Sequence, residues 1–502
     1  MLYISTRGKG EGVSASQAVL SSLAGDGGLY VPKVIPTFSY SRIQSMQHKP
    51  YEEQAYQVIA PYLQDMGEKD LKESLARAYR PGKFSDPNIA PLKKAKENLF
   101  VLELWHGPTA AFKDMALQLL PHLMNSAKKK EGEKRQSLIL VATSGDTGKA
   151  ALEGFKDVEK TRVLVFFPED GVSELQKRQM VSQKGDNVRV IGVKGNFDDA
   201  QKGVKKIFSD PSLGGIMEQA GYMFSSANSI NWGRLMPQMV YYFTAYAQLL
   251  RQGAIRDGET FNVVVPTGNF GNILAGYYAR KMGLPIHRLI CASNANRVLA
   301  DFINTGKYDI RRDFIKTMSP SMDILVSSNL ERLLYDISEQ DAEEVSDWMS
   351  SLQRKRHYQI GGDMLKKIQR TFYGGCADEE DTRKAIRELF AKTGYLMDPH
   401  TAVGYHVYQD YVKDCGNERC TVLLSTASPF KFPASVMKAL KPDGIFCRKD
   451  EFALLKELRN ESKQEIPLNL LSLEERQVLH DQTCSPDNMG EMVRELLVDN
   501  NE

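Results

Sequence analysis

The chain has 502 residues, 42% hydrophobic and 25% charged, which is enough for several domains with ordinary globular cores. Its formal net charge of +2 gives no reason to expect a nucleic acid or an anionic membrane surface as partner. The first residues contain no apolar h-region, so no signal peptide is expected, and no apolar run reaches the roughly 20 residues that cross a bilayer. The 6 cysteines form no CxxC pair, which is typical of free thiols, so we expect a cytoplasmic protein.

Residues 1–97 are expected to form a separate, mostly helical unit. A turn at Asp26 to Gly28 precedes a short strand that Pro32 ends. Apolar residues at helical spacing then run from Ala55 to Leu75. The stretch from Arg80 to Lys94 is rich in Pro and Gly, and it is expected to be a loop that marks the boundary of this unit.

From residue 98 onwards, apolar strands alternate with helices. Strands are predicted at Leu99 and after, before Thr143, before Pro168, before Thr267 and before Thr426. This alternation indicates an α/β fold with a parallel sheet covered on both faces. The charged stretch 128–136 is expected to be a solvated loop, and residues 305–378 show no regular pattern.

One lysine lies in an unusual apolar setting. Lys113 follows Phe112, two alanines and a Gly107-Pro108 turn, and an apolar helical pattern comes after it. Burial disfavours the charged form of an amine, and a neutral lysine is a nucleophile that can form a Schiff base. The alternative is a lysine whose stem lies along an apolar face with its head in water, as most lysines do.

Two loops follow predicted strands and open helices, where free backbone N–H groups and the helix dipole favour anions. The loop from Thr267 to Asn272 has glycines that let the backbone approach a phosphate, although a structural turn would look the same. It matches neither GxGxxG nor the P-loop pattern, so no dinucleotide or ATP site is predicted. The loop from Thr143 to Gly148 offers hydroxyls that suit a carboxylate or simply cap a helix.

Other polar residues also fall at informative places. Thr426 ends a strand, where its hydroxyl can bond a ring nitrogen without a charge, or merely cap a turn. The stretch from Asn228 to Arg234 contains an arginine that suits a phosphate, with a surface ion pair as the alternative. No histidines have metal-ligand spacing, so no metal is predicted, and His106 and His400 have no assigned role.

A lysine, a phosphate-type loop, a carboxylate-type loop and a strand-end hydroxyl together indicate a pyridoxal phosphate site. The ordered motifs HGPTAAFKD, TSGDTG, NFDDAQ, NSINWGRL, GNFGN, DPHTA and STASPFKF resemble those of the threonine synthase family, in its longer-chain class. STRG and DGGLYVP resemble the N-terminal domain of that family, so the resemblance covers nearly the whole chain. The family belongs to the tryptophan-synthase-like, fold type II group of pyridoxal phosphate enzymes.

The resemblance implies a fold and a domain organisation. We expect two open, twisted, mainly parallel sheets flanked by helices, with a mostly helical N-terminal domain at 1–97. The catalytic region, 98–502, would contain two subdomains, the smaller one roughly from 115 to 235 and the larger one built from the remainder.

The resemblance also assigns roles to residues. Lys113 would form the Schiff base with the cofactor, and Thr426 would face its pyridine nitrogen. The cofactor phosphate would be held by Gly268, Asn269, Phe270, Gly271 and Asn272. The substrate would be bound by Ser144, Asp146, Thr147, Asn228, Ser229, Asn231 and Arg234. Many members have histidine where this chain has Ser428, but the ring contact of Thr426 should remain.

The implied reaction, in threonine biosynthesis, converts O-phospho-L-homoserine and water to L-threonine and phosphate. The enzyme would be a carbon–oxygen lyase that works by γ-elimination and β-addition of water, as a monomer or homodimer. Lys113 would move the α proton, and Arg234 would assist departure of phosphate. The alternatives are a related phospho-lyase that gives 2-oxobutyrate and a non-catalytic binding protein on the same scaffold.

Overall fold

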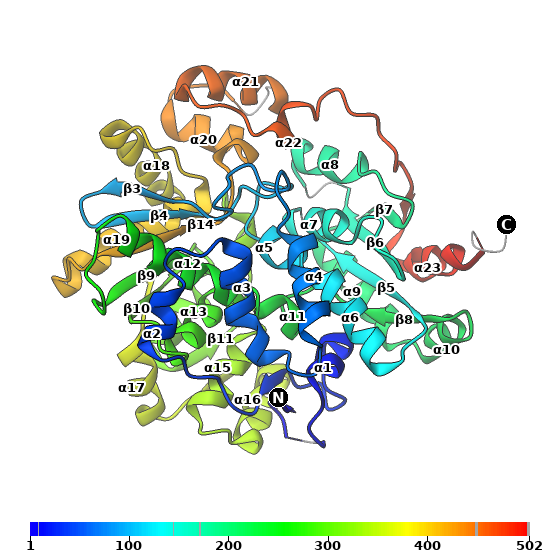
Figure 1. The fold of residues 1–502 in the computed structure, drawn as a ribbon. Helices are drawn as coiled ribbons and strands as arrows, with labels where there is room; N and C mark the ends of the chain where they lie inside the picture. The colour runs from blue at the N-terminus through cyan, green and yellow to red at the C-terminus, as the bar shows by residue number, and fades with distance from the viewer. Residues whose placement is uncertain (9, 144, 170–171, 447–449, 499–502) are drawn as a thin grey trace.

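The computed structural model describes residues 1–8, 10–143, 145–169, 172–446 and 450–498. Its larger sheet has six strands in the order β13-β10-β9-β14-β4-β3, all paired in parallel except β3 with β4 (Figure 1). These strands are β3 (Leu92–Lys96), β4 (Leu99–Glu103), β9 (Phe261–Pro266), β10 (Ile286–Ser293), β13 (Phe372–Cys376) and β14 (Thr421–Ser425). Every residue of β4, β9 and β14 is buried because helices cover both faces.

The smaller sheet is entirely parallel, in the order β15-β7-β6-β5-β8. Its strands are β5 (Gln136–Ala142), β6 (Thr161–Pro168), β7 (Val188–Val193), β8 (Tyr222–Ser225) and β15 (Thr483–Cys484). Alternate residues of β5 belong to two different cores: Leu138 and Leu140 pack with α9 (Phe197–Ser209), whereas Ile139 and Val141 pack with α7 (Asp146–Phe155). This period of two is the pattern of a strand covered on both sides. The expected architecture of two mainly parallel sheets flanked by helices is therefore confirmed.

The N-terminal region is mostly helical, as predicted, and shares one core with the catalytic region. Its elements are β1 (Tyr3–Ser5), α1 (Ala15–Ser21), β2 (Tyr30–Pro32), α2 (Tyr40–Ser45), α3 (Tyr51–Ile59), η1 (Ala60–Tyr62) and α4 (Glu68–Ala78). Figure 1 shows these elements in blue, with α1 and α4 beside α6 (Leu120–Glu131) and α3 beside α12 (Gln238–Arg251). Buried Trp232 lies at the junction, with its ring centroid 5.6 Å from those of Tyr3 and Tyr62.

Three local predictions were wrong. The expected loop from Arg80 to Lys94 ends earlier, because β3 begins at Leu92 and joins the larger sheet. The domain boundary at residue 97 stays a prediction. Residues 128–131 of the expected charged loop belong instead to α6. Lys128 is buried there, and its Nζ is satisfied by donating to the carbonyls of Arg135 and Lys160, at 3.0 and 2.9 Å.

The region 305–378 is regular instead of patternless. It contains β11 (Lys307–Asp309), η2 (Pro320–Met322), α15 (Leu330–Ile337), α16 (Ala342–Lys355), β12 (His357–Gln359), α17 (Gly362–Thr371) and β13. The clearest missed signal is in α15, which buries Leu330, Leu333, Leu334 and Ile337 at the i, i+3, i+4, i+7 spacing of an amphipathic helix.

The end of the chain returns to the smaller sheet. From α21 (Glu451–Ser462) and α22 (Leu468–Leu471) the chain crosses, in red in Figure 1, to β15, which pairs with β7, and then to α23 (Met489–Val498), which packs on α9. The smaller sheet thus takes its outermost strand from beyond residue 235. No helix in the described ranges has the length and apolar character needed to span a membrane.

A glycine fixes how closely α7 approaches α5 (Asp114–Leu117), the helix that follows Lys113. A Cβ atom added at Gly154 would lie 2.1 Å from the carbonyl oxygen of Leu117. Gly154→Ala should therefore destabilise the protein by about 1–3 kcal/mol, seen as a lower thermal unfolding midpoint. Gly214→Ala in α10 (Pro211–Gln219) is the control, because a Cβ there meets nothing within 4 Å. Equal midpoints for the two variants would contradict this close approach.

Candidate active site

The loop that carries Lys113 follows β4 and is held in place by the end of β14, the strand that pairs with β4. The N–H of Phe112 donates to the carbonyl of Thr426 at 2.8 Å, and the N–H of Ser428 donates to the carbonyl of Ala110 at 3.1 Å. Ala110 has a left-handed backbone, with φ of 57°, so the chain turns sharply just before the lysine. The lysine is therefore presented at the carboxyl ends of parallel strands, where ligand crevices form in such sheets.

The turn before Lys113 is closed by Asp114. The carboxylate of Asp114 accepts hydrogen bonds from both the N–H and the hydroxyl of Thr109, each at 2.8 Å. A Cβ at Gly107 would lie 2.5 Å from the Oδ2 atom of Asp114, so only glycine lets the turn close over the carboxylate. Burial raises the pKa of Asp114 to about 6. The Gly-Pro turn is thus a packing requirement of the lysine loop.

Lys113 is buried, as its apolar setting predicted, but its amine is surrounded by charged groups that the local sequence does not contain. Its Nζ lies 3.5 Å from the Oδ2 atom of Asp146 and 3.1 Å from the hydroxyl of Ser321. Burial lowers the pKa of Lys113 to about 8; Asp146 opposes this shift, and the positive charges of Arg234 and Lys431 add to it. About a tenth of the amine is therefore neutral and nucleophilic at pH 7, far more than for an ordinary lysine.

Asp146, the first residue of α7, binds a second buried lysine. Its Oδ1 atom lies 2.5 Å from the Nζ of Lys431, which also donates to the carbonyl of Thr109 at 3.0 Å. Burial opposes ionisation of Asp146, but the attraction of Lys431 and Lys113 holds the pKa of its carboxyl below the ordinary value. Asp146 is therefore a carboxylate between two lysines.

Sequence reasoning missed Lys431, although it lies in the STASPFKF motif. The only signal was a second lysine between apolar residues. It ends the short turn η3 (Pro429–Lys431), and the hydroxyl of Ser428 caps that turn by accepting the N–H of Phe430. Ser428, for which no role was predicted, thus helps to place Lys431.

The glycine loop after β9 packs tightly against two other segments. A Cβ at Gly268 would lie 2.5 Å from the carbonyl oxygen of Ser321, and one at Gly271 would lie 3.3 Å from the Nδ2 of Asn329. The same Nδ2 atom donates to the carbonyl of Asn269 and to the hydroxyl of Ser229, at 3.1 Å each. Asn329, which is fully buried and was not predicted, therefore joins the expected phosphate loop to the expected substrate loop.

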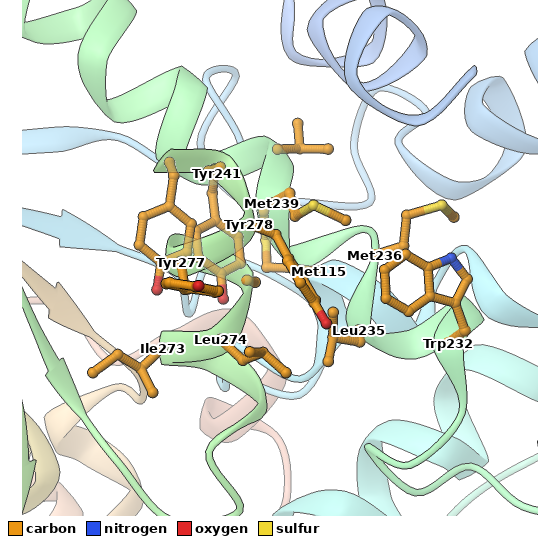
Figure 2. Close-up of a cluster of buried hydrophobic side chains, with 14 of the residues drawn as sticks. Met115, Trp232, Leu235, Met236, Met239, Tyr241, Ile273, Leu274, Tyr277 and Tyr278 are labelled. Atoms are coloured by element: carbon orange, nitrogen blue, oxygen red, sulfur yellow. The ribbon is translucent and has the colours of Figure 1, made fainter. Parts of the chain in front are cut away.

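The helix that follows, α13 (Gly271–Lys281), begins with an unused donor. Phe270, its N-cap, has a left-handed backbone with φ of 62° and gives no side-chain cap. The Oδ1 atom of buried Asn272 accepts the hydroxyls of Tyr241 and Tyr242, at 2.6 and 2.9 Å. Its Nδ2 has no partner among the described residues. Figure 2 shows Tyr241 with Tyr277 and Ile273 in the apolar cluster around this helix. A buried donor without a partner costs about 1–3 kcal/mol, so an acceptor from a ligand is expected there.

Arg234 adds an unneutralised charge. Its guanidinium is buried in the short helix α11 (Trp232–Leu235) and donates to the carbonyl of Ala227. In the described parts of the chain no carboxylate lies within 4.0 Å of it. Burial lowers the pKa of Arg234 to about 10, which still leaves it charged at neutral pH. A buried cation without a carboxylate partner suits an anionic ligand.

The remaining predicted residues are less uniform. Thr426 is buried, and its hydroxyl has no hydrogen-bond partner in the part of the chain that the structure describes. Thr147 lies half-buried in the first turn of α7, Asn228 is exposed, and Ser144 lies outside the described residues. Asn231, grouped by the sequence with the substrate-binding residues, has structural contacts: its Nδ2 donates to the carbonyl of Val19 and the hydroxyl of Ser22, and its Oδ1 accepts the N–H of Gly233. Both polar atoms are used to hold α1 and to cap α11. A role for it in substrate binding stays a prediction.

The two histidines without predicted roles have different surroundings. His106 bonds Glu103 through Nε2 and Ser85 through Nδ1, both at 2.9 Å, and stacks on Trp105 with centroids 4.3 Å apart. It therefore ties the loop after α4 to β4. His400 is buried near Lys113, and its Nε2 accepts the N–H of Ser321 at 3.1 Å. Among the described residues no group of three or more His, Cys, Asp or Glu side chains could hold a metal ion.

Two mainly parallel sheets with a buried, partly neutral lysine where they meet define a pyridoxal-phosphate-dependent enzyme of fold type II. Three family models match the chain in order. The model of the threonine synthase N terminus matches residues 2–79, that of pyridoxal-phosphate-dependent enzymes residues 87–363, and that of the threonine synthase C-terminal region residues 401–479. The chain belongs to the threonine synthase family.

Similar proteins agree with this assignment. Threonine synthase of Pseudomonas aeruginosa is 40% identical over 440 residues, which are 88% of this chain and 90% of that one. Threonine synthase-like 1 of Macaca fascicularis is 42% identical over 437 residues, 85% of this chain, and this chain spans only 58% of that longer relative. The crystal structure of PLP-bound threonine synthase from Brucella melitensis has a TM-score of 0.87 and 37% identity, and the match covers 99% of this chain and 98% of that chain.

The cofactor is pyridoxal phosphate, and the residues present fit it. The unpaired Nδ2 of Asn272 and the free N-terminus of α13 suit its phosphate. A side chain at Gly268 would collide with the carbonyl of Ser321, and one at Gly271 would lie tightly against Asn329, which shapes that loop. The unpartnered hydroxyl of Thr426 suits the ring nitrogen.

The lowered pKa of Lys113 should depend on Lys431. Lys431→Met removes a positive charge and frees Asp146 to act on Lys113 alone, so the pKa of Lys113 should rise above about 8, by about one unit. The check is the pH dependence of acylation of Lys113 in cofactor-free protein, followed by mass spectrometry. Lys438→Met, an exposed lysine of α20 (Pro433–Leu440), is the control. A Lys113 pKa that falls or stays constant in Lys431→Met would contradict this electrostatic role.

Proposed function

We propose that the protein is a threonine synthase that converts O-phospho-L-homoserine and water to L-threonine and phosphate. The observation that carries this proposal is Arg234, a buried guanidinium with no carboxylate within 4.0 Å in the described chain, whose charge acts on Lys113. A phosphate on the substrate would supply the anion that this guanidinium lacks, close enough to the reacting amine for the charge of Arg234 to act on Lys113. Membership of the threonine synthase family supports the same reaction.

In the proposed mechanism, bound pyridoxal phosphate supplies the aldehyde that captures amines and the ring that withdraws electrons from the substrate. Lys113, with its lowered pKa, takes the proton from Cα of the substrate and later returns one. Arg234 pairs with the γ-phosphate and stabilises the charge that grows on it as it leaves. Asp146 holds the ammonium form of Lys113, so the proton stays beside the reacting carbon.

The other predicted ligands take supporting roles in this proposal. Gly268, Asn269, Phe270, Gly271 and Asn272 would hold the cofactor phosphate, and Thr426 would face the ring nitrogen as a neutral hydroxyl. Ser144 and Thr147, at the start of α7, would contact the substrate carboxylate, and Asn228 and Ser229 the substrate phosphate. A cytoplasmic location and a monomeric or homodimeric state stay predictions.

Product analysis tests the reaction. The cofactor-loaded protein should release L-threonine and phosphate in equal amounts from O-phospho-L-homoserine, and Lys113→Ala should release neither. Formation of 2-oxobutyrate and ammonia without threonine would identify a phospho-lyase instead. A protein that shows no yellow chromophore, and no borohydride-reduced adduct on Lys113, would be the non-catalytic alternative.

Arg234→Lys tests the proposed phosphate contact. Lysine keeps the charge but loses the two-pronged geometry, so kcat/KM for O-phospho-L-homoserine should fall about 10- to 100-fold. The absorbance of bound cofactor should change little. Arg370→Lys, at an exposed position of α17, provides the matched control and should behave as the unmodified protein. An unchanged kcat/KM in Arg234→Lys would place the substrate phosphate elsewhere.

A further inference from the structure

Ser321 touches three parts of the active site, although sequence reasoning placed it in a region without pattern. Its hydroxyl lies 3.1 Å from the Nζ of Lys113 and 3.4 Å from the Oδ2 of Asp146. Its carbonyl oxygen is the atom that excludes a side chain at Gly268, 2.5 Å from where a Cβ would lie. One residue thus contacts the lysine, the carboxylate beside it and the wall of the glycine loop.

His400 and Asp398 hold Ser321 from behind. The Nε2 of His400 accepts the backbone N–H of Ser321 at 3.1 Å, and its Nδ1 bonds the Oδ1 of Asp398 at 2.7 Å. Because Nε2 accepts, the ring proton is on Nδ1 and is donated to the carboxylate, which fixes the tautomer. His400 is 1% exposed and Asp398 0%, and the ring of Phe432 meets the imidazole edge-on at 5.1 Å. The imidazole therefore has one orientation.

The segment that carries Ser321 is fastened on both sides. The Nδ2 of Asn294, at the end of β10, donates to the hydroxyls of Thr317 and Ser319 and to Asp323, at 2.9, 3.0 and 2.8 Å. The N–H of Thr317 donates to the same aspartate at 2.9 Å. The position of the Ser321 hydroxyl is thus determined by the larger sheet and by α19 (Pro399–Cys415), which begins after Asp398.

The hydroxyl of Ser321 does no local structural work. Serines in turns usually bond a nearby backbone group, as Ser428 does with the N–H of Phe430. In the described chain the partners of the Ser321 hydroxyl are instead Lys113 and Asp146, 208 and 175 residues away. Its hydroxyl is therefore positioned to bind the amine of Lys113 and the carboxylate beside it.

We propose that Ser321 is a catalytic residue: whenever the amine of Lys113 is not bonded to the cofactor, it is bound by the Ser321 hydroxyl together with Asp146. In this proposal His400 and Asp398 are the residues that position Ser321. This inference rests on the proposed function, in which the amine is released and carries the substrate proton. As an ammonium group, Lys113 donates to Ser321, and the Ser321 hydroxyl donates to Asp146. The bond holds the protonated amine in place until the proton is returned.

The first test uses cofactor-free protein. Ser321→Ala removes an acceptor from the ammonium form, while Asp146, Arg234 and Lys431 still face Lys113. The pKa of Lys113 should therefore fall by about one unit, measured by the pH dependence of its acylation. Ser321→Thr keeps the hydroxyl and should keep the pKa. An unchanged Lys113 pKa in Ser321→Ala, with an unchanged thermal midpoint, would overturn the proposal.

The second test uses the holoenzyme and separates catalysis from binding. Ser321→Ala should lower kcat at least about 10-fold with KM changed less than about twofold, since only the released amine is affected. His400→Leu should reproduce both effects, and His400→Gln, which can still accept the Ser321 N–H, should restore most of the loss. Equal behaviour of His400→Leu and His400→Gln would exclude the positioning role.

The two tests also separate this inference from the proposed function. If the unmodified protein forms no threonine, the proposed function fails, but the pKa of Lys113 in cofactor-free Ser321→Ala still decides on the hydroxyl. If His400→Leu does not fold, the comparison of Ser321→Ala with Ser321→Thr decides alone.

Discussion

The active site depends on a carboxylate buried between two lysines. Asp146 begins α7, the helix that follows β5 of the smaller sheet, Lys113 lies in the loop after β4, and Lys431 lies in the turn after β14. Breaking a buried ion pair by removal of one partner typically costs about 3–5 kcal/mol, because the other charge is left without compensation. Separation of the three segments therefore has a high free-energy cost. Asp146 links the smaller sheet to the larger one at the place where the chemistry is proposed.

The backbone around β14 supports this charge arrangement. Thr426 holds Phe112, Ser428 holds Ala110 and caps the turn to Lys431, so three consecutive residues and a short turn place both lysines. On the far side of the site, buried Arg332 joins the N-terminal region to it: Arg332 donates to the carbonyls of Tyr30, Ile230 and Ser229 and to the side chain of Asn329. The neighbouring Glu331 pairs with Arg7 at 3.0 Å. The N-terminal region thus holds the back of the glycine loop through Asn329.

Local patterns in the sequence predicted the fold class and the burial of Lys113. The residues whose contacts are long-range could not be predicted in this way. The alternation of strands and helices and the apolar surroundings of Lys113 are local features, and both led to correct expectations about fold and burial. The contacts that bring Lys431, Ser321 and Asn329 into the site are with partners more than 50 residues away, and no pattern near them in the sequence indicates those partners. Asn231 shows the opposite problem, because an asparagine before a helix serves equally well as a ligand or as a cap. The amphipathic spacing in α15 was readable and was missed.

The second lysine resolves a conflict in what Lys113 must do. A buried amine needs a polar partner to hold it in place, yet a carboxylate as partner raises the pKa of the amine and keeps it charged. Asp146 alone would therefore anchor Lys113 at the expense of its nucleophilicity. Because Lys431 lies 2.5 Å from Asp146, the carboxylate is shared between two ammonium groups. Lys113 remains anchored, while burial, together with the charges of Arg234 and Lys431, lowers its pKa to about 8. Together Lys113, Lys431 and Arg234 give the site more positive than negative charge, a balance that an anionic cofactor and an anionic substrate would complete.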